Sequence, residues 1–362
     1  MSFERLKPFN DLPELPPQFT LETHAILKKV IEAHRALADV KRMGFLLPDQ
    51  AILIQTLGLR EAKMSSEIEN IVTTNDELYK AYSDQNNEMM PETLEVLHYQ
   101  KAIWYGFNAM KNNRLLTTSL FEELCQYVNG NTSGIRKTGG TKLANQEGKI
   151  MYTPPEGENI IRAKLHNLEK FIYEQTSPAS TLDPLIKLAL IHYQFESIHP
   201  FYDGNGRTGR IINILYLIEE KLLDLPILYL SGDFLNNTAD YYNGLRNVTE
   251  HSKWLEWIEF FLNAIINASV DTKNRIKAIH ELMESTSLVI QQQLPKIYSK
   301  ELVEVLFERP YCKIRFLEEA KIAQRQTASQ YLKQLEEIGV LKTEKAGREK
   351  YYYNENFLKI LS

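Results

Sequence analysis

Two apolar stretches joined by a polar loop constrain the fold of this chain more than any other feature. They read LIKLALIHYQFESIHPFYDGNGRTGRIINILYLIEE, residues 185–220. Pro200 disfavours the helical conformation of the residue before it, so we expect the first helix to end at Ile198. Gly204 and Gly206 are conformationally permissive and allow a tight turn before a second helix, which we expect to begin near Arg207. The pattern therefore predicts helix, loop and helix.

The loop, HPFYDGNGRTGR, combines groups that suit phosphate chemistry. Its glycines lead into a helix N-terminus, whose free N–H groups and dipole favour an anion. Arg207 and Arg210 are neighbours on one helical face and can bind phosphate oxygens with both arms of the guanidinium. Asp203 suits Mg²⁺, which binds through one or two carboxylates plus substrate phosphates. His199 can take a proton from an attacking hydroxyl. The loop thus predicts transfer of a phosphorus group from a nucleotide to an alcohol.

The rest of the chain predicts a mainly helical protein. A proline-rich start, residues 1–17, is expected to form an extended arm. Apolar residues recur at helical spacing in several segments, at residues 20–43, 94–110, 118–128, 159–174 and 182–197.

The loop sequence resembles the signature of the Fic (filamentation induced by cAMP) family, His-x-Phe-x-Asp/Glu-Gly-Asn-Gly-Arg-x-x-Arg, at every specified position. The resemblance implies a Fic-fold helical bundle and transfer of AMP from ATP to Ser, Thr or Tyr hydroxyls of target proteins and of the enzyme itself. It also implies the roles of the loop residues: His199 as general base with Asn205 as a second catalytic residue, Asp203 as Mg²⁺ ligand, Gly204, Asn205 and Gly206 as the α/β-phosphate cradle, Arg207 and Arg210 as β/γ-phosphate ligands, and Phe201 as a core anchor.

Two more segments fit the family. The sequence KIMYTPP, residues 149–155, is placed like a β-hairpin flap that pairs with the backbone of the target. We expect a hairpin centred on the flap residues Lys149, Ile150, Met151, Tyr152 and Thr153.

The sequence DYYNGLRNVTE, residues 240–250, resembles the helix whose tyrosines border the adenine of ATP. Tyr241 and Tyr242 point about 100° apart on a helix, so we expect one of them to stack on the base. The alternative is that both fill the core.

The sequence SSEIEN, residues 65–70, matches the inhibitory pattern of the family, Ser/Thr-x-x-x-Glu-Gly/Asn, at Ser65, Glu69 and Asn70. The resemblance implies an inhibitory helix at about residues 61–71. Glu69 would pair with Arg210, so that ATP binds with its α-phosphorus misaligned for attack. The alternative is an exposed helical glutamate.

Residues 286–362 resemble a winged helix-turn-helix domain with a recognition helix at residues 324–334. Its strands are expected on either side of Ala346 and Gly347. The candidate DNA contacts are Gln326, Ser329, Gln330 and Lys333 for the major groove, and Lys345, Arg348 and Lys350 for phosphates. Because Glu336, Glu337 and Glu349 oppose DNA binding, a protein partner stays open.

We expect three domains: an N-terminal helical region at 1–112, a Fic core at 113–285 and the winged helix at 286–362. The sequence has no apolar run near the ~18 residues of a membrane span and begins without a signal peptide, so no membrane partner is expected. Its two cysteines lie far apart, which favours a reducing, cytoplasmic location. Residues 296–362 carry a net charge of +3 and the rest −8.

Three functions remain open from the sequence. The first is an autoinhibited, Mg²⁺- and ATP-dependent protein adenylyltransferase. The second is a DNA-binding regulator that senses nucleotides and catalyses little. The third is an enzyme that removes AMP from modified targets, with Glu69 activating water. A homodimer is an open partner in each case.

Overall fold

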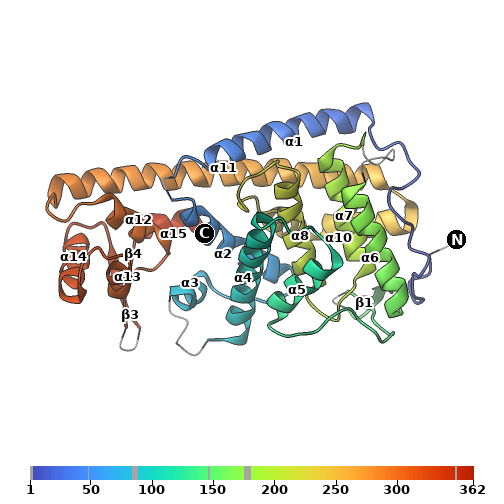
Figure 1. Ribbon diagram of the computed structural model, residues 1–362, viewed down its shortest axis with the longest axis horizontal. Coiled ribbons are helices and arrows are strands. Elements are labelled where there is room, and N and C mark those ends of the chain that lie inside the picture. Colours follow the sequence, from blue (N-terminus) through green and yellow to red (C-terminus); the bar gives the residue numbers. More distant parts are fainter. Residues whose placement is uncertain (1–2, 48, 84–88, 146, 175–180, 347–348) are drawn as a thin grey trace.

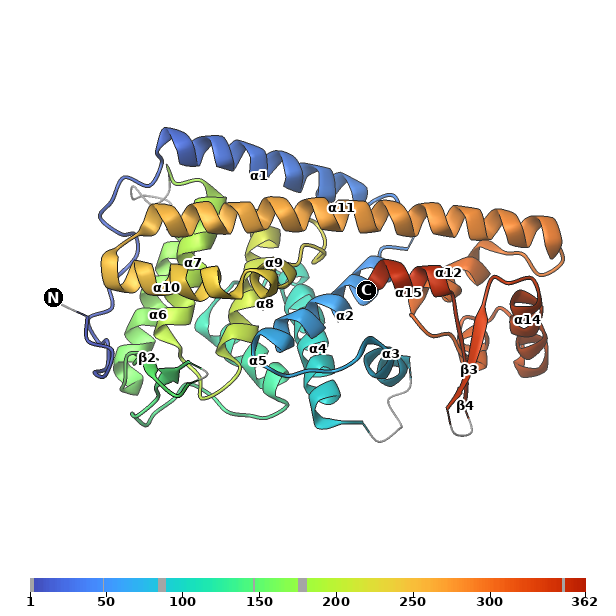
Figure 2. The ribbon, with the colours of Figure 1, turned by 180° about the vertical axis from the view of Figure 1, so that it is seen from behind.

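A computed structural model describes residues 3–47, 49–83, 89–145, 147–174, 181–346 and 349–362 of the chain. It is mainly helical with two small two-stranded sheets, which confirms the expected fold class. Helices α1 to α10 form a large bundle and α12 to α15 form a smaller group at the opposite end of the molecule (Figures 1 and 2). Within the described ranges, no helix combines the length and the apolar character needed to cross a membrane.

The elements of the large bundle follow in chain order: α1 (His24–Met43), α2 (Ala51–Ile68), α3 (Asn75–Ser83), α4 (Pro91–Lys111), α5 (Thr118–Asn129), β1 (Leu143–Ala144), β2 (Ile150–Tyr152), α6 (Glu158–Tyr173), α7 (Pro184–Ile198), α8 (Asn205–Glu219), α9 (Ser231–Asn236) and α10 (Thr238–His251). The helices predicted at 20–43, 94–110, 118–128, 159–174 and 182–197 are all present, with ends within a few residues of those expected.

The core of the bundle is built on α7 and α8, in which almost every residue is buried. A helix that is apolar on all sides belongs in a core, and neighbouring helices from both halves of the bundle pack around these two. His192 of α7 lies in an aromatic cluster and bonds Tyr241 and Asn213 through its two ring nitrogens, at 2.9 and 3.0 Å. The predicted catalytic loop therefore joins the two most deeply buried helices.

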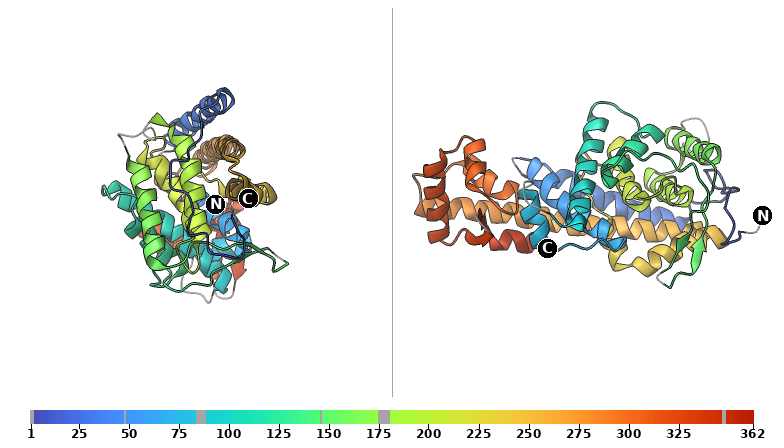
Figure 3. Two further views of the ribbon diagram at one scale, coloured as in Figure 1. Left: turned by 90° about the vertical axis from the view of Figure 1, so that its right-hand side faces the viewer. Right: turned by 90° about the horizontal axis from the view of Figure 1, so that it is seen from below.

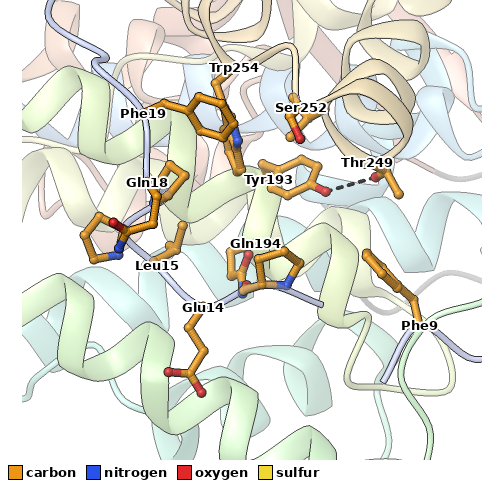
Figure 4. A pocket seen from close by; sticks show the side chains of 14 residues that line it. Phe9, Glu14, Leu15, Gln18, Phe19, Tyr193, Gln194, Thr249, Ser252 and Trp254 are labelled. Carbon is orange, nitrogen blue, oxygen red and sulfur yellow. Dashed lines mark hydrogen bonds between the residues drawn. The ribbon is translucent and has the colours of Figure 1, made fainter. Parts of the chain in front are cut away.

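The described part of the N-terminal arm is non-helical, as its prolines predict, but it is not fully extended: it turns at residues 5–6 and 10–11 and packs against the bundle. Phe9 donates its N–H to the carbonyl of Thr153, and Gln194 donates to the carbonyl of Pro13. A cavity of about 490 Å³ separates part of this arm from α7 and from the junction of α10 with the next helix (Figure 4). The residues that line this cavity include Tyr193 and Trp254 but none of residues 199–210.

The longest element is α11 (Trp254–Gln293), whose 40 residues extend over about 60 Å. It runs from the large bundle to the C-terminal group, with α1 packed along it (Figures 1 and 3). The domain boundary expected between residues 285 and 286 falls inside this helix, so the backbone continues as helix through that position.

The C-terminal module, residues 294–362, comprises α12 (Lys300–Glu308), α13 (Ile314–Glu319), α14 (Arg325–Glu337), a hairpin of β3 (Lys342–Ala346) and β4 (Glu349–Tyr353), and α15 (Glu355–Leu361). Three helices and a hairpin occur in the predicted order, whereas α15 was not expected. The module contacts α3: Lys80 pairs with Glu344 at 2.6 Å, and the Tyr311 hydroxyl donates to Asp76 at 2.5 Å.

Candidate active site

The predicted loop connects α7 to α8 and is held in shape by hydrogen bonds within it. His199 ends α7 in the left-handed conformation, with φ 48°, and Gly204 precedes α8 at φ 75°. The Asn205 side chain accepts the N–H of Phe201 at 2.8 Å and donates to its carbonyl at 2.9 Å. Because both polar atoms of this amide are engaged, Asn205 acts through its side chain as a positioning residue for the loop. Phe201 is buried in the core, as predicted.

Helix α8 begins at Asn205, two residues earlier than the sequence led us to expect. Only Gly204 therefore lies before the helix, and Gly206 occupies its first turn. Gly204 combines a positive φ with a close neighbour, because a Cβ there would lie 2.5 Å from the Asn129 side-chain oxygen. A side chain at this position would be both strained and obstructed.

His199 is held in its neutral form. Burial lowers the pKa of its imidazole to about 4, and the nearby Arg136 guanidinium acts in the same direction. The Nδ1 atom is buried and has no hydrogen-bond partner within the described part of the chain. A neutral imidazole keeps a lone pair on one of its nitrogens; because Nδ1 is buried out of reach of a target, Nε2 is the atom at which the ring can accept a proton, as a general base must.

Arg136 supports this loop and was not found from the sequence. Its Nε donates to the His199 carbonyl at 2.6 Å, and its Nη2 donates to the carbonyls of Pro155 and Ile198 at 2.6 and 3.2 Å. The side chain is fully buried. It thereby joins the catalytic loop to the end of the predicted flap. These acceptors lie about 20 and 60 residues away in sequence, so no local pattern signals the role.

Arg210 is bound entirely to the end of α2. Its Nε donates to the Ser65 hydroxyl at 2.7 Å, and its Nη2 donates to the Ser65 carbonyl and to Glu69 Oε1, both at 2.8 Å. The guanidinium is 2% exposed. Burial alone would lower its pKa, but the Glu69 carboxylate outweighs that effect and the pKa is raised. The structure thus brings Ser65, Glu69 and Arg210 together.

Arg207 is also bound by Glu69, a contact that the sequence did not suggest. Its Nε donates to Glu69 Oε2 at 2.8 Å, so one carboxylate bridges both arginines. Its Nη1 donates to Glu95 of α4 at 3.0 Å, and its Nη2 lies 3.5 Å from Asp203. Gly206 leaves room for this arrangement, because a Cβ there would lie 2.5 Å from Glu69 Oε1.

Glu69 lies just outside a helix, which corrects the expected helix at about residues 61–71. Helix α2 ends at Ile68, Glu69 is its C-cap, and Asn70 takes a left-handed conformation with φ 63°. Ile71 and Asn70 donate their N–H groups back to the carbonyls of Ser66 and Glu67. This is the Schellman arrangement, in which Gly or Asn is preferred at the left-handed position. The preference for Gly or Asn after the glutamate is therefore conformational.

Asp203 is the most exposed polar group of the loop, with 76% of its side chain accessible. Its Oδ1 accepts the N–H of Gly204 at 2.8 Å, and its backbone carbonyl accepts from Asn129 at 3.0 Å. Among the residues that the structure describes, no three His, Cys, Asp or Glu side chains form a group able to hold a metal ion.

The two candidate adenine contacts differ. Tyr241 is 1% exposed, packs on Trp257 and Phe234 and shares a hydrogen bond with His192, so it belongs to the core and offers no face to an adenine, contrary to its choice as a candidate contact. Tyr242 is 50% exposed and keeps an accessible ring. Of the two tyrosines, Tyr242 is therefore the one whose ring remains accessible to a ligand.

The predicted flap contains a hairpin, but its centre is displaced. Residues 150–152 form only the second strand, β2, which pairs with β1 in the register Leu143 to Tyr152 and Ala144 to Ile150. Lys149 is exposed at the turn, Ile150 and Met151 are half-buried, and Thr153 is buried beneath the arm. The Tyr152 hydroxyl donates to the Ser197 carbonyl at 2.8 Å, which fixes β2 beside the end of α7.

Three family models match successive parts of the chain. They are the Fic/DOC family N-terminal model at residues 27–108, the Fic/DOC family model at residues 115–217, and the model of the C-terminal domain of SoFic-like protein adenylyltransferases at residues 282–357. The catalytic loop lies inside the second match, and the Glu69 turn lies inside the first.

Solved structures show the same fold over most of the chain. A Fic family protein from Desulfovibrio desulfuricans G20 superimposes with a TM-score of 0.59 at 20% identity, over 94% of this chain and 98% of the other. Fic-1 of Caenorhabditis elegans gives a TM-score of 0.52 at 19% identity, over 71% and 75% of the two chains. These likenesses establish the class of the fold, a mainly helical Fic fold.

Curated relatives agree with that class at modest identity. A probable protein adenylyltransferase of Aquifex aeolicus is 28% identical over 50% of this chain and 45% of its own length. The protein adenylyltransferase Fic of Drosophila melanogaster is 28% identical over 44% of this chain and 28% of its own length. The chain thus spans less than half the length of these relatives. From the family models, the fold and the complete loop signature, the chain belongs to the Fic/DOC family.

Proposed function

We propose that the protein is an adenylyltransferase that transfers AMP from ATP to hydroxyl groups of target proteins, and that Glu69 restrains it. The observation that carries the proposal is the placement of His199 at the end of α7, one short loop before the N-terminus of α8 and its two buried arginines. A base and a phosphate-binding site in one loop are what attack on a nucleotide phosphorus needs. The matched relatives named protein adenylyltransferases support the same activity.

The triphosphate binds where the Glu69 carboxylate now lies. The N–H groups of Asn205 and Gly206 belong to the first turn of α8, where no acceptor exists within a helix. Together with the helix dipole they attract the α- and β-phosphates. Arg207 and Arg210 then hold the β- and γ-phosphates in place of Glu69. Tyr242 offers a ring for the adenine.

The donor set at Asp203 fits Mg²⁺. Its carboxylate is exposed and reaches only Arg207, at 3.5 Å, and Gly204 among its described neighbours. A single carboxylate suffices for Mg²⁺ when nucleotide phosphates and water supply the other ligands. The ion would be held by Asp203 and would supply charge neutralisation for the leaving pyrophosphate.

In the proposed transfer, every proton and bond that changes has a group to receive it. His199 accepts the proton of the target hydroxyl as its oxygen attacks the α-phosphorus. A phosphorus–oxygen bond forms to the target, the bond between the α-phosphorus and the bridging oxygen breaks, and pyrophosphate leaves. Strand β2 has one strand neighbour among the described residues, so its other edge can pair with an extended target segment and register the hydroxyl.

The test compares Glu69→Gly with the unaltered protein and with the double variant Glu69→Gly/His199→Ala, using ATP labelled at the α-phosphate. We expect Glu69→Gly to raise protein labelling roughly ten- to hundredfold, because correct alignment of a reacting group is worth that order of rate. The added His199→Ala substitution should abolish the labelling. Mass spectrometry of a treated lysate would then identify the modified hydroxyls.

Glu67→Gly provides the control, since it makes the same change two positions earlier on α2. Labelling that rises equally in both variants would show helix loosening and would contradict restraint by Glu69. Labelling that does not depend on His199, or ATP binding without labelling in Glu69→Gly, would overturn the proposed activity.

The DNA-binding alternative has one observation in its favour: α14 lies at the end of the molecule with Gln326, Gln330 and Lys333 exposed. Ser329 is half-buried, Lys345 is exposed and Arg348 lies outside the described residues. Lys350 is engaged with Glu336 at 3.1 Å, which reduces the charge offered to phosphates. We therefore propose the C-terminal module as a partner-binding accessory to the enzyme. A gel-shift assay with duplex DNA at several salt concentrations tests whether that partner is nucleic acid.

Removal of AMP from targets would need Glu69 as a base for water. Both oxygens of Glu69 are bound to arginines at 2.8 Å, so in this state the carboxylate is committed to them. The geometry therefore supports the forward transfer with restraint more directly than the reverse reaction.

A further inference from the structure

Arg207 has a carboxylate on each of its three guanidinium nitrogens. Glu69 binds Nε at 2.8 Å, Glu95 binds Nη1 at 3.0 Å, and Asp203 lies 3.5 Å from Nη2. The three carboxylates come from three different places: the end of α2, the first part of α4, and the loop itself. The arginine side chain is 1% exposed, so the contacts are formed at a buried charge.

Arg210 is bound differently. Within the described part of the chain, its side-chain hydrogen bonds go to Ser65 and Glu69, which belong to one segment. Departure of Glu69 therefore removes the one carboxylate that binds Arg210 among the described residues. The same departure leaves Arg207 with Glu95 still bound, because α4 is a separate helix.

Glu95 is placed so that it can leave. Its side chain is 41% exposed, against 23% for Glu69, and no other hydrogen bond to it is found among the described contacts. Water can solvate the released carboxylate, so displacement costs little. An incoming triphosphate carries several negative charges and binds Arg207, Arg210 and the helix N-terminus together, which lets it compete for the guanidinium.

We propose that Glu95 is a second inhibitory carboxylate: it competes with the nucleotide triphosphate for Arg207 and sets the affinity for ATP independently of Glu69. The inference rests on the proposed nucleotide-binding function of the loop. It assigns the restraint of the two arginines to two helices, with α2 acting on both and α4 acting on Arg207 alone.

The experiment measures the Kd of Mg²⁺-ATP by calorimetry on full-length protein that carries His199→Ala to prevent turnover. Four forms are compared: no further change, Glu69→Gln, Glu95→Gln, and both. We expect Glu95→Gln to lower the Kd roughly three- to tenfold in either Glu69 background, the range that one partly exposed charge pair supports. The Kd of adenosine, which lacks phosphates, should stay the same.

Glu92→Gln is the matched control, because Glu92 lies exposed in the first turn of the same helix and should leave the Kd unchanged. In the catalytically competent Glu69→Gly background, Glu95→Gln should lower the KM for ATP at constant kcat. A residue that merely orients Arg207 would behave in the opposite way, with weaker ATP binding on substitution.

Unchanged or weaker ATP binding in Glu95→Gln, while Glu69→Gln binds ATP, overturns this inference and leaves the proposed function intact. Absence of ATP binding in all four folded forms overturns both. Thermal unfolding of each variant confirms that the comparison is made between folded proteins.

Discussion

The catalytic loop and the C-terminal module use their charged residues in different ways. Arg207 and Arg210 of the loop, and Arg136 beside it, are buried, and carbonyl or carboxylate oxygens bind them. In the module, Lys333 pairs with Glu337 and Lys350 pairs with Glu336 on the surface. Buried charges that lose a partner are costly, whereas exposed pairs contribute little. The difference teaches that substitutions in the loop will affect stability and chemistry together, while those in the module will affect contacts with partners.

The largest effect is expected for Arg136→Ala. The substitution leaves the carbonyls of Pro155, Ile198 and His199 without a buried donor, so we expect a loss of roughly 3 kcal/mol of folding free energy. Urea unfolding measures it, with the half-exposed Arg162→Ala as control. A loss no larger than that of the control would remove the distinction between buried and exposed arginines.

The pH dependence of the folding free energy provides a second test of how the large bundle buries its titratable groups. Burial lowers the pKa of His199 to about 4 and that of His192 to about 3, whereas unfolded histidine titrates near 6.5. The unfolded chain therefore binds protons first as pH falls, so stability is fully present above pH 6.5 and declines as the pH drops toward 4. Each imidazole contributes on the order of 2 kcal/mol to this loss between pH 7.5 and 5, and Glu196, whose pKa is raised to about 7 by burial, offsets part of it.

Urea unfolding at several pH values checks this decline. His199→Gln removes one of the two titrating groups and should flatten the profile. A profile that keeps the same steepness in His199→Gln would contradict the lowered pKa of His199 on which the proposed general base depends.

A smaller effect is expected for Tyr242→Ala, which removes the exposed ring proposed to stack on adenine. We expect the KM for ATP to rise about five- to tenfold, in line with the contribution of one base-stacking aromatic side chain. Steady-state labelling kinetics in the Glu69→Gly background measure it. Tyr241→Phe is the comparison, because it removes only the hydroxyl bond to His192 in the core. A KM that responds to Tyr241→Phe more than to Tyr242→Ala would reverse the assignment.

The smallest effect is expected for Lys333→Ala in the module. Its side chain is 71% exposed and its nearest acidic partner lies at 3.6 Å, so we expect stability to change by less than about 0.5 kcal/mol. AMP transfer to an added target should stay within about twofold. A large loss of transfer would show that the module takes part in the chemistry, and it would contradict the division of roles between the loop and the module.

The sequence predicted the parts of the site that depend on local pattern. The loop between two apolar helices, the buried Phe201 and the closeness of Glu69 to Arg210 all follow from short motifs. Helix extents followed from periodicity, because burial of one face repeats along each helix.

Contacts between segments that are distant in the sequence could not be predicted from it. Glu95 meets Arg207 across 112 residues and Arg136 meets the His199 carbonyl across 63, and neither has a neighbour in sequence that reveals its partner. The Asn70 turn was placed inside a helix because its left-handed conformation depends on one residue. Helix α11 continues through the boundary expected near residue 285, since its periodicity extends past the change in composition.

The continuous helix α11 has a consequence for how a bound partner would be positioned. A helix without an interruption gives the two ends of the molecule no hinge, and the ion pair of Lys80 with Glu344 and the hydrogen bond of Tyr311 to Asp76 also join α3 to the module. Anything that docks on α14 is therefore presented from a rigid spacer of several nanometres. Under the proposed function, a target docked on α14 would be modified only if its dimensions let one of its hydroxyl groups reach His199.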